Sequence, residues 1–234
     1  MHTPFASLQF GEDARALERF AGLRSQRPCA AVRPERAAAR KHYAEEVHWA
    51  ARPSEFYDDT VRAELREMYW AAPKPAPRDG ARGPCRFAMH VRRGDVSPDG
   101  PDPARYTPNR VYAAAARDVA RARVGANATV CAFSQGARAD FAELEALGVE
   151  LRLDEELSAT FHAMVTAENL LIATSSLSYA AAILSENRVY YAGRLLHRPL
   201  DDWHRIDCVD RPCALGSPAC ETGTALSCLD TTGT

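Results

Sequence analysis

Short apolar runs alternate with helix-like segments through residues 84–205, and this alternation limits the fold more than any other feature of the sequence. The first run, Phe87–Val91, has the length and composition of a strand at the centre of a sheet. The expected strands are residues 87–92, 128–133, 149–153, 170–173 and 189–191. The helices expected between them are residues 106–121, 139–147, 158–166 and 179–184. The pattern predicts an α/β fold with a Rossmann-like parallel sheet and right-handed crossovers.

A proline-rich segment, Pro73–Gly80, precedes this region and breaks all regular structure. Residues 1–76 carry apolar side chains at helical spacing, which predicts a smaller, mostly helical N-terminal part. The helices expected there are residues 12–24, 34–50 and 59–69. The opening segment His2–Phe5 reads like the middle of a chain, so we expect the N-terminal part to be truncated.

Composition argues against two classes of partner. The 234 residues carry a formal net charge of −2, which gives no reason to expect a nucleic-acid partner. No apolar run approaches the roughly 20 residues that cross a bilayer, and the N-terminus lacks the apolar core of a signal peptide. A membrane anchor is therefore expected only if a missing N-terminal segment supplies it.

A cysteine-rich tail, residues 206–234, follows the expected sheet. Its four cysteines lack the C-x2-C spacing of a structural zinc site. They are Cys208, Cys213, Cys220 and Cys228. Two disulfides, in any of three connectivities, would order a tail so poor in apolar residues, and the alternative is a loose tail with free thiols. Disulfides favour the Golgi or another secretory-pathway lumen, and the glycosylation sequon at Asn127–Thr129 is compatible with that location; a cytoplasmic location is the alternative.

Two adjacent arginines follow the first expected strand, within the segment His90-Val91-Arg92-Arg93-Gly94-Asp95. Ligands gather at the carboxyl ends of parallel strands, and guanidinium groups present N–H donors in fixed forks that suit a diphosphate. Gly94 permits a sharp turn or a close approach of a ligand, and Asp95 can hold one guanidinium in place. The alternative is an arginine pair on a solvated loop.

Ser175 and Ser176 stand between the fourth expected strand and an apolar helix. The free N–H groups at the start of that helix, with two hydroxyls beside them, make an anion site at the positive end of the helix dipole. The alternative is a serine that only caps the helix. Because both loops should emerge at the same edge of the sheet, the sequence predicts a pyrophosphate site between the arginines and the serines.

The segment His90–Asp95 resembles the H-x-R-R-x-D signature of GDP-fucose-dependent fucosyltransferases of the α1,2, α1,6 and protein-O type. The segments Phe133–Gly136 and Ala173–Ser178 are similar to further motifs of that superfamily, in the same order and at the same separation, so the resemblance covers residues 85–192. It implies a GT-B glycosyltransferase. Residues 84–205 would then form the nucleotide-sugar-binding domain, and residues 1–76 the acceptor side.

The resemblance also implies a chemistry and roles for individual residues. Fucose would pass from GDP-fucose to a hydroxyl of a glycan or protein acceptor, by inverting transfer without a metal or other cofactor. Arg92 would be the catalytic residue that holds the β-phosphate. The implied donor-binding residues are His90, Arg93, Asp95, Ser134, Thr160, His162, Ser175 and Ser176. Arginine can stabilise a departing diphosphate electrostatically, and no Asp-x-Asp metal motif lies beside these loops.

Other functions remain open at this stage. No general base can be chosen among the acids of the N-terminal half, which are Glu45, Glu55, Asp58 and Asp59. Relatives often carry acidic residues where this chain has Ser134 and the turn Thr160–His162, and Gln135 replaces a common aspartate. One alternative is therefore a non-catalytic nucleotide-sugar-binding or structural domain. Another is a transferase that uses a different nucleotide sugar.

Overall fold

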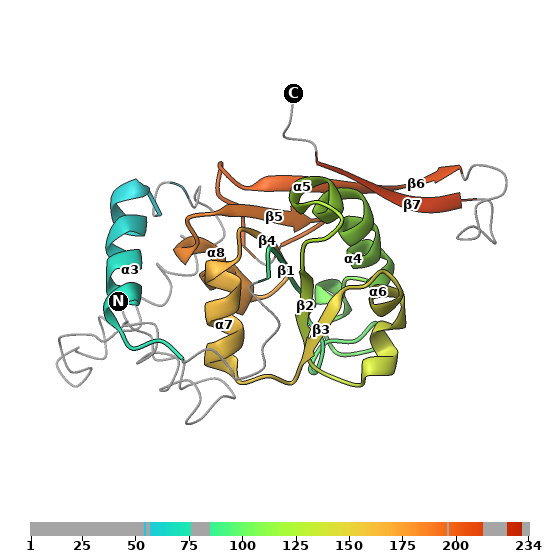
Figure 1. Cartoon of the computed structure of the whole chain (residues 1–234), viewed down its shortest axis with the longest axis horizontal. Helices are drawn as coiled ribbons and strands as arrows, with labels where there is room; N and C mark the ends of the chain where they lie inside the picture. Colours follow the sequence, from blue (N-terminus) through green and yellow to red (C-terminus); the bar gives the residue numbers. More distant parts are fainter. Residues whose placement is uncertain (1–53, 55–56, 76–84, 196, 213–223, 231–234) are drawn as a thin grey trace.

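A computed structural model describes residues 54, 57–75, 85–195, 197–212 and 224–230. These residues build one seven-stranded sheet with helices on both faces (Figure 1). The strand order is β3-β2-β1-β4-β5-β6-β7, parallel except for the antiparallel β6–β7 pair. The strands are β1 (Phe87–His90), β2 (Val130–Ser134), β3 (Glu150–Leu153), β4 (Asn169–Ile172), β5 (Arg188–Ala192), β6 (His204–Pro212) and β7 (Thr224–Asp230). The predicted Rossmann-like parallel α/β fold is confirmed.

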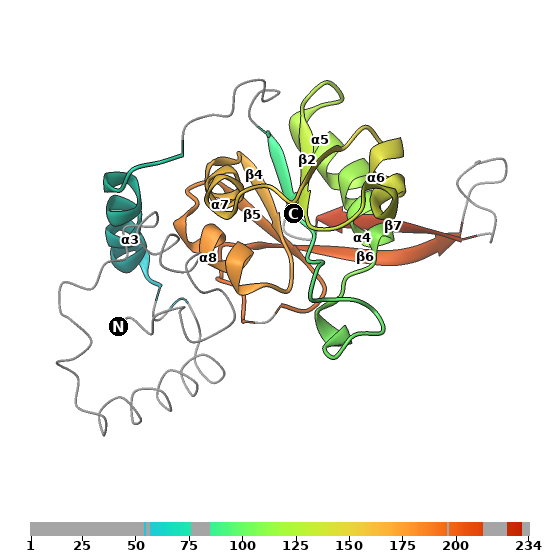
Figure 2. The same cartoon turned by 90° about the horizontal axis from the view of Figure 1, so that it is seen from below.

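The helices cover the two faces of the sheet separately. One face carries α4 (Asn109–Ala115), the π-helical turn η5 (Ala116–Ala120), α5 (Arg121–Val124), the 3-10 turn η6 (Arg138–Phe141) and α6 (Ala142–Ala146). The other carries α7 (Leu157–Thr166) and α8 (Ser176–Leu184), with α3 (Asp59–Ala71) against them. The α3 helix stands at one end of the molecule and the β6–β7 hairpin extends at the other (Figure 2).

Alternation of side chains along the strands builds a core on each face. Phe87 and Met89 of β1 join a buried cluster with Tyr112 of α4. Ala88, between them in sequence, points to the opposite cluster, which includes Phe161 of α7. All four residues of β1 are buried, as expected for a strand covered by helices on both faces.

The strand order reverses between β1 and β4. From β1 the chain steps outward to β2 and β3, and α7 then carries it back across the sheet to β4, on the other side of β1. Two loops therefore leave the sheet in opposite directions from its central strands. Residues 91–108 and 173–175, called the switch-point loops below, follow the carboxyl ends of β1 and β4. Nucleotides bind at this position in doubly wound folds.

The first crossover helix differs from the expected segment 106–121. It starts at Asn109, with Pro108 at the N-cap position and no side-chain cap, and it continues through η5 to Val124. Thr107 therefore does not cap it, and the Thr107 carbonyl accepts a hydrogen bond from Arg93. The loop before it, expected to be irregular, contains a 3-10 turn, η4 (Pro103–Arg105).

The described part of the tail contributes to the sheet. The boundary predicted between residues 205 and 206 falls inside β6, and Ile206 is buried in the core. Cys208 is disulfide-bonded, and the strand register puts its backbone opposite that of Cys228. Cys213 and Cys220 lie outside the described residues, so the structure does not test which of the three connectivities the tail adopts.

A second disulfide, Cys85–Cys131, was not expected from the sequence. It joins the residue two positions before β1 to the second residue of β2, and both cysteines are buried. The disulfide could be inferred only from the strand register, because the parallel β1–β2 pairing is what brings two cysteines 46 residues apart to a Cα–Cα distance of 5.7 Å.

Only α3 of the expected N-terminal helices lies within the described residues; the expected helices 12–24 and 34–50 lie outside them. Asp58 caps α3 by accepting a hydrogen bond from the Val61 N–H at 2.9 Å. Tyr69 is fully buried against the sheet domain, whereas Met68, its neighbour in the helix, is 39% exposed. No helix of the described segments is long and apolar enough to cross a membrane.

Candidate functional site

Most of the residues singled out in the sequence motifs follow the carboxyl ends of β1, β2 and β4. The register of β1 with β4 pairs Met89 with Leu171. Arg92 and Thr174 each lie three residues further along the chain, so the arginine loop and the start of α8 leave the sheet from neighbouring positions. This arrangement is the one that the sequence predicted for the two loops.

Arg92 is mostly buried and is held by the acid of its own motif. Its Nη2 donates to Asp95 Oδ2 at 2.6 Å, which confirms the expected pairing. The Arg92 side chain is 15% exposed, and its Nε is buried without a hydrogen-bond partner among the described residues. The guanidinium therefore keeps donors that a bound anion could accept from.

The turn after Arg92 packs tightly against the loop after β2. Gly94 has a φ of +82°, and a Cβ built there would lie 2.6 Å from Gln135 Oε1. Ser134, the last residue of β2, donates its hydroxyl to the Val91 carbonyl at 2.7 Å. Ser134 therefore supports the arginine loop through the backbone. Gly94 makes the expected turn, and the group that approaches it closely is the side chain of Gln135.

We expect Gly94→Ala to lower the free energy of unfolding by about 1–2 kcal/mol, because alanine is strained at positive φ and its Cβ meets Gln135. Gly193 offers a matched control, since its φ is +68° and nothing lies within 4 Å of a built Cβ. In urea unfolding, Gly94→Ala should lower the free energy of unfolding more than Gly193→Ala does. The combination of Gly94→Ala with Gln135→Ala should lower it by the same amount as Gly193→Ala. Equal costs for the two single variants would contradict the steric part of the argument.

Arg93 turns away from Arg92 and fastens the loop that leads into α4. Its Nη1 donates to the Arg92 carbonyl at 2.7 Å and its Nη2 to the Thr107 carbonyl at 2.9 Å. Nη2 also hydrogen-bonds Asn109, and the guanidinium stacks on the Tyr106 ring at 4.3 Å. These contacts give Arg93 a structural task within the loop.

The two serines at the start of α8 have different environments. Ser175 is buried and is the N-cap residue, with its hydroxyl accepting from the Leu177 N–H at 3.3 Å. Ser176, at the first helical position, is exposed, and its hydroxyl lies 3.5 Å from His197 Nε2. Among the described residues, no hydrogen bond joins Arg92 to either serine.

His90 ends β1 and is buried beside Arg92. Its side chain is 6% exposed, and its Nδ1 has no hydrogen-bond partner within the described segments. Burial, and then the nearby positive charge of Arg92, lower the pKa of His90 to about 3. The imidazole is therefore neutral at physiological pH, and a ring nitrogen with no protein partner lies next to the arginine loop.

The low pKa of His90 predicts a pH dependence of stability. The unfolded chain binds the proton with a pKa near 6.5 and the folded chain only near 3, so stability should be lost as the pH falls through this interval. Replacing His90 with Gln should remove this loss, which is on the order of a few kcal/mol between pH 7 and pH 4. The check is urea unfolding of both proteins at several pH values; parallel profiles would contradict the burial of a neutral histidine.

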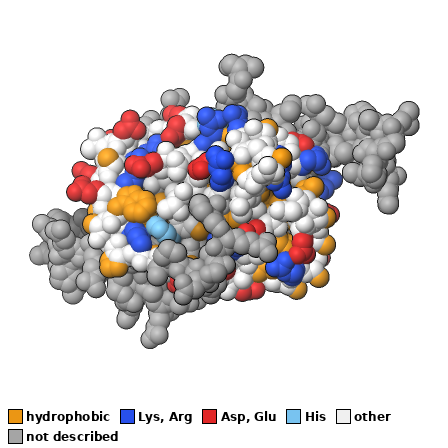
Figure 3. Space-filling view, viewed as in Figure 1, with side chains coloured by type: hydrophobic (Ala, Val, Ile, Leu, Met, Phe, Trp, Pro, Cys, Tyr) orange, Lys and Arg blue, Asp and Glu red, His pale blue; other side chains and the backbone are white. Residues whose placement is uncertain are grey.

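The structure does not bring His162 to the switch-point loops. His162 lies in the middle of α7 and its Nδ1 is 2.6 Å from the hydroxyl of Tyr69 on α3. Burial and Lys74 lower the pKa of His162, and Trp70, which is 49% exposed, packs edge-on against its ring. Exposed apolar surface lies beside a histidine and basic side chains at this end of the molecule (Figure 3). Thr160, in the first turn of α7, is half-buried, and within the described segments no hydrogen bond joins its side chain to Arg92 or the serines.

Two residues near these loops were missed in the sequence. Arg105, on η4, donates from its Nε to the Thr174 carbonyl at 3.4 Å. His197, after β5, packs against Tyr179 of α8 with ring centroids 4.9 Å apart. Arg105 follows the arginine motif by ten residues, in a segment that was expected only to be irregular. Nothing in the sequence around His197 marks it as a functional residue.

The two candidate bases that the structure describes, Asp58 and Asp59, are not at the switch point. Glu45 and Glu55 lie outside the described residues. Asp58 caps α3, and Asp59 lines a cavity of about 310 Å³ with the turn Leu200–Asp202, which leads into the amino end of β6. Of the part of the chain that is described, no group of three or more His, Cys, Asp or Glu side chains could hold a metal ion. The chain matches no protein-family model, no curated protein and no solved structure.

Proposed function

We propose that the chain is a fucosyltransferase-like glycosyltransferase that binds GDP-fucose at the switch-point loops and transfers fucose to a hydroxyl of a glycan or protein. The observation that carries the proposal is the position of the Arg92 turn beside the start of α8, where the strand order reverses. A helix start and a guanidinium with free donors together favour a phosphate group.

The proposed chemistry asks the protein mainly to stabilise a leaving group. As the acceptor hydroxyl attacks the anomeric carbon from the opposite side, negative charge develops on the departing diphosphate. Arg92 carries a fixed positive charge, and the α8 N-terminus adds N–H donors that are already oriented. A GT-B arrangement would bring the acceptor from the N-terminal part.

A second candidate is a nucleotide-sugar-binding protein without catalytic activity. It is favoured by one observation: the described candidate bases, Asp58 and Asp59, lie against the turn before β6 and away from Arg92. Binding would need only the phosphate contacts, whereas transfer also needs a base across from them.

The test is a panel of GDP-, UDP- and ADP-sugars with release of the nucleotide diphosphate as the readout, together with calorimetric titration of each nucleotide. The proposal expects binding of GDP and GDP release from GDP-fucose that increases with acceptor. Binding of a nucleotide without release of the diphosphate from its sugar, whichever acceptor is supplied, would favour the non-catalytic candidate. Release from a UDP- or ADP-sugar alone would assign a different donor, and no binding of any nucleotide would overturn the proposal.

We also propose an oxidising compartment such as the Golgi lumen. Its support is the buried Cys85–Cys131 disulfide, since such bonds persist where thiols are not kept reduced. Asn127 of the sequon is exposed in the turn before β2, where a glycan could be accommodated. Glycosidase treatment of the protein from secreting cells should shift its mass; an unmodified Asn127 together with free thiols at Cys85 and Cys131 would contradict the proposal.

A further inference from the structure

The two arginines of the motif are not equivalent as phosphate ligands. Arg93 uses both Nη groups on protein acceptors, the carbonyls of Arg92 and Thr107 and the side chain of Asn109, and its face is stacked on Tyr106. An anion could recruit it only by breaking contacts that hold the loop. The Arg92 guanidinium, by contrast, makes a single hydrogen bond within the described residues, to Asp95.

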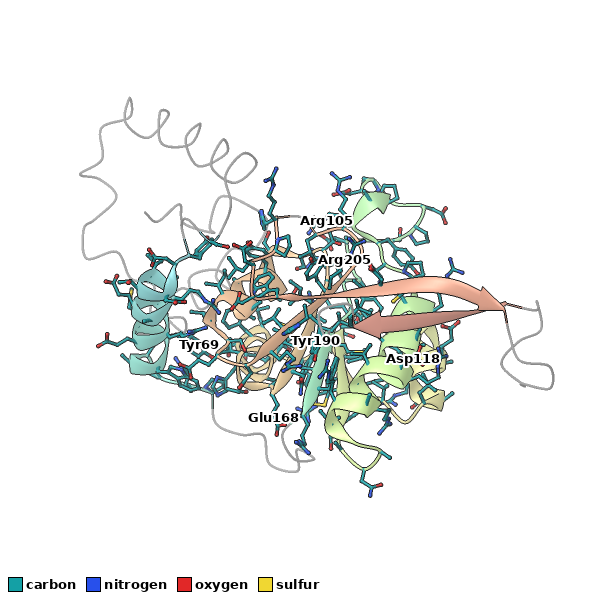
Figure 4. The ribbon with its side chains drawn as sticks, turned by 90° about the horizontal axis from the view of Figure 1, so that it is seen from above. Tyr69, Arg105, Asp118, Glu168, Tyr190 and Arg205 are labelled. Carbon is teal, nitrogen blue, oxygen red and sulfur yellow. A yellow bond between two sulfur atoms is a disulfide. The ribbon has the colours of Figure 1, made fainter. Side chains whose placement is uncertain are left out.

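Arg105 is a third guanidinium at the same edge of the sheet. It belongs to η4, in the loop that follows β1, and its Nε donates to the carbonyl of Thr174. Thr174 immediately precedes Ser175, the N-cap of α8, so this contact joins the two switch-point loops. Figure 4 shows Arg105 at one end of the sheet and Glu168, which precedes β4, at the other.

The donors of Arg105 remain largely available. Its other close partner is Asp102, whose Oδ2 lies 3.9 Å from Nε, beyond hydrogen-bonding distance. Neither Nη group of Arg105 has a hydrogen-bond partner among the residues that the structure describes, although the side chain is only 23% exposed. A half-buried guanidinium with a free fork, fixed beside a helix N-terminus, has the features of an anion ligand.

We propose that Arg105, and not Arg93, is the second guanidinium that binds the diphosphate with Arg92. Arg93 is a positioning residue: by stacking on Tyr106, the neighbour of Arg105, it fixes the loop that carries Arg105. The Thr174 carbonyl holds the Arg105 Nε, which leaves the two Nη groups for phosphate oxygens beside α8. This inference rests on the proposed function, because it assigns a ligand to the same site.

The test is calorimetric titration of inorganic pyrophosphate and of GDP, UDP and ADP into the full chain and four variants. Arg105→Gln should weaken pyrophosphate and nucleoside diphosphate binding about 10- to 100-fold, while the thermal midpoint without ligand changes little. Arg105→Lys should recover only part of the loss, since an ammonium cannot replace a fork. Arg93→Gln should mainly lower the midpoint of the free protein. Arg188→Gln removes the same charge at the amino end of β5, where it is exposed, and should leave binding unchanged.

The outcomes separate this inference from the proposed function. Normal diphosphate binding by Arg105→Gln overturns the role of Arg105 and leaves the proposed function standing. The role of Arg105 is also overturned, and the proposed function stands, if Arg93→Gln weakens diphosphate binding without lowering the thermal midpoint while Arg105→Gln binds normally. If the wild-type chain binds pyrophosphate through Arg105 but none of the nucleotides, the proposed function fails and the role of Arg105 stands. If the wild-type chain binds none of the four ligands, both are overturned.

Discussion

Arg92→Ala is expected to abolish release of the nucleotide from the donor sugar, with a loss of at least about 100-fold, and to leave the protein folded. Removing one preorganised donor to a developing anion has effects of this size in other enzymes. The cost to stability should be small, less than about 1 kcal/mol, because the one side-chain hydrogen bond that is lost within the described segments is the bond to the exposed Asp95. Arg92→Lys should also lose most of the activity, since a point charge makes no bidentate contact.

The measurements are donor turnover and the thermal midpoint of each variant, with Arg188→Ala as the charge-matched control. A turnover of Arg92→Ala within a factor of about three of the wild-type value would refute the catalytic role. A large drop in the midpoint would instead assign Arg92 to the fold. The pKa of His90 gives a further readout, because Arg92 is one of the two causes that lower it, and the pKa should rise in Arg92→Ala.

Loss of the Cys85–Cys131 disulfide should produce the largest change in stability. The bond closes a loop across 46 residues of sequence, and the loop-entropy relation for such a closure gives about 4 kcal/mol. The double variant Cys85→Ala with Cys131→Ala should therefore unfold at a clearly lower urea concentration. Both positions are buried, so packing losses add to the effect.

A reducing agent alone would not isolate this bond, because Cys208 is disulfide-bonded too. The double variant should be measured with and without reductant, so that the remaining shift reports the bond at Cys208. A double variant within about 1 kcal/mol of the wild-type chain would mean that the closed loop adds nothing to stability.

The alternation of apolar runs was enough to predict the sheet and the edge at which the loops meet. The central strands β1, β2 and β4 are short and almost entirely buried, so most of their side chains are apolar whichever strand lies beside them, and the alternation is visible in the sequence. The tail strands escaped prediction because β6 and β7 carry charged residues and cysteines, without an apolar run. The Cys85–Cys131 bond escaped for a related reason, since it depends on which strands are neighbours.

The different tasks of Arg92 and Arg93 could not be read from their sequence, because the two residues are adjacent and chemically identical. Their partners decide between them. Asp95 lies only three residues from Arg92, so one short sequence motif contains both partners. Arg93 is held by Thr107 and Asn109, which follow it after a long loop and lie outside the motif. The His162 assignment has the same weakness: helical spacing places it on a face of α7, but only tertiary packing reveals that α3 covers that face.

The central strand is fastened differently at its two ends. At its amino end, Cys85 is bonded covalently to β2, and Arg86 forms hydrogen bonds at 2.8–2.9 Å with Glu168, just before β4. At its carboxyl end the ties to the loops are single ionic or polar contacts, such as the one from Arg105 to the Thr174 carbonyl. The covalent bond therefore fixes the amino end of β1 to β2, whereas the loops beyond the carboxyl ends of β1 and β4 are joined to each other by non-covalent contacts.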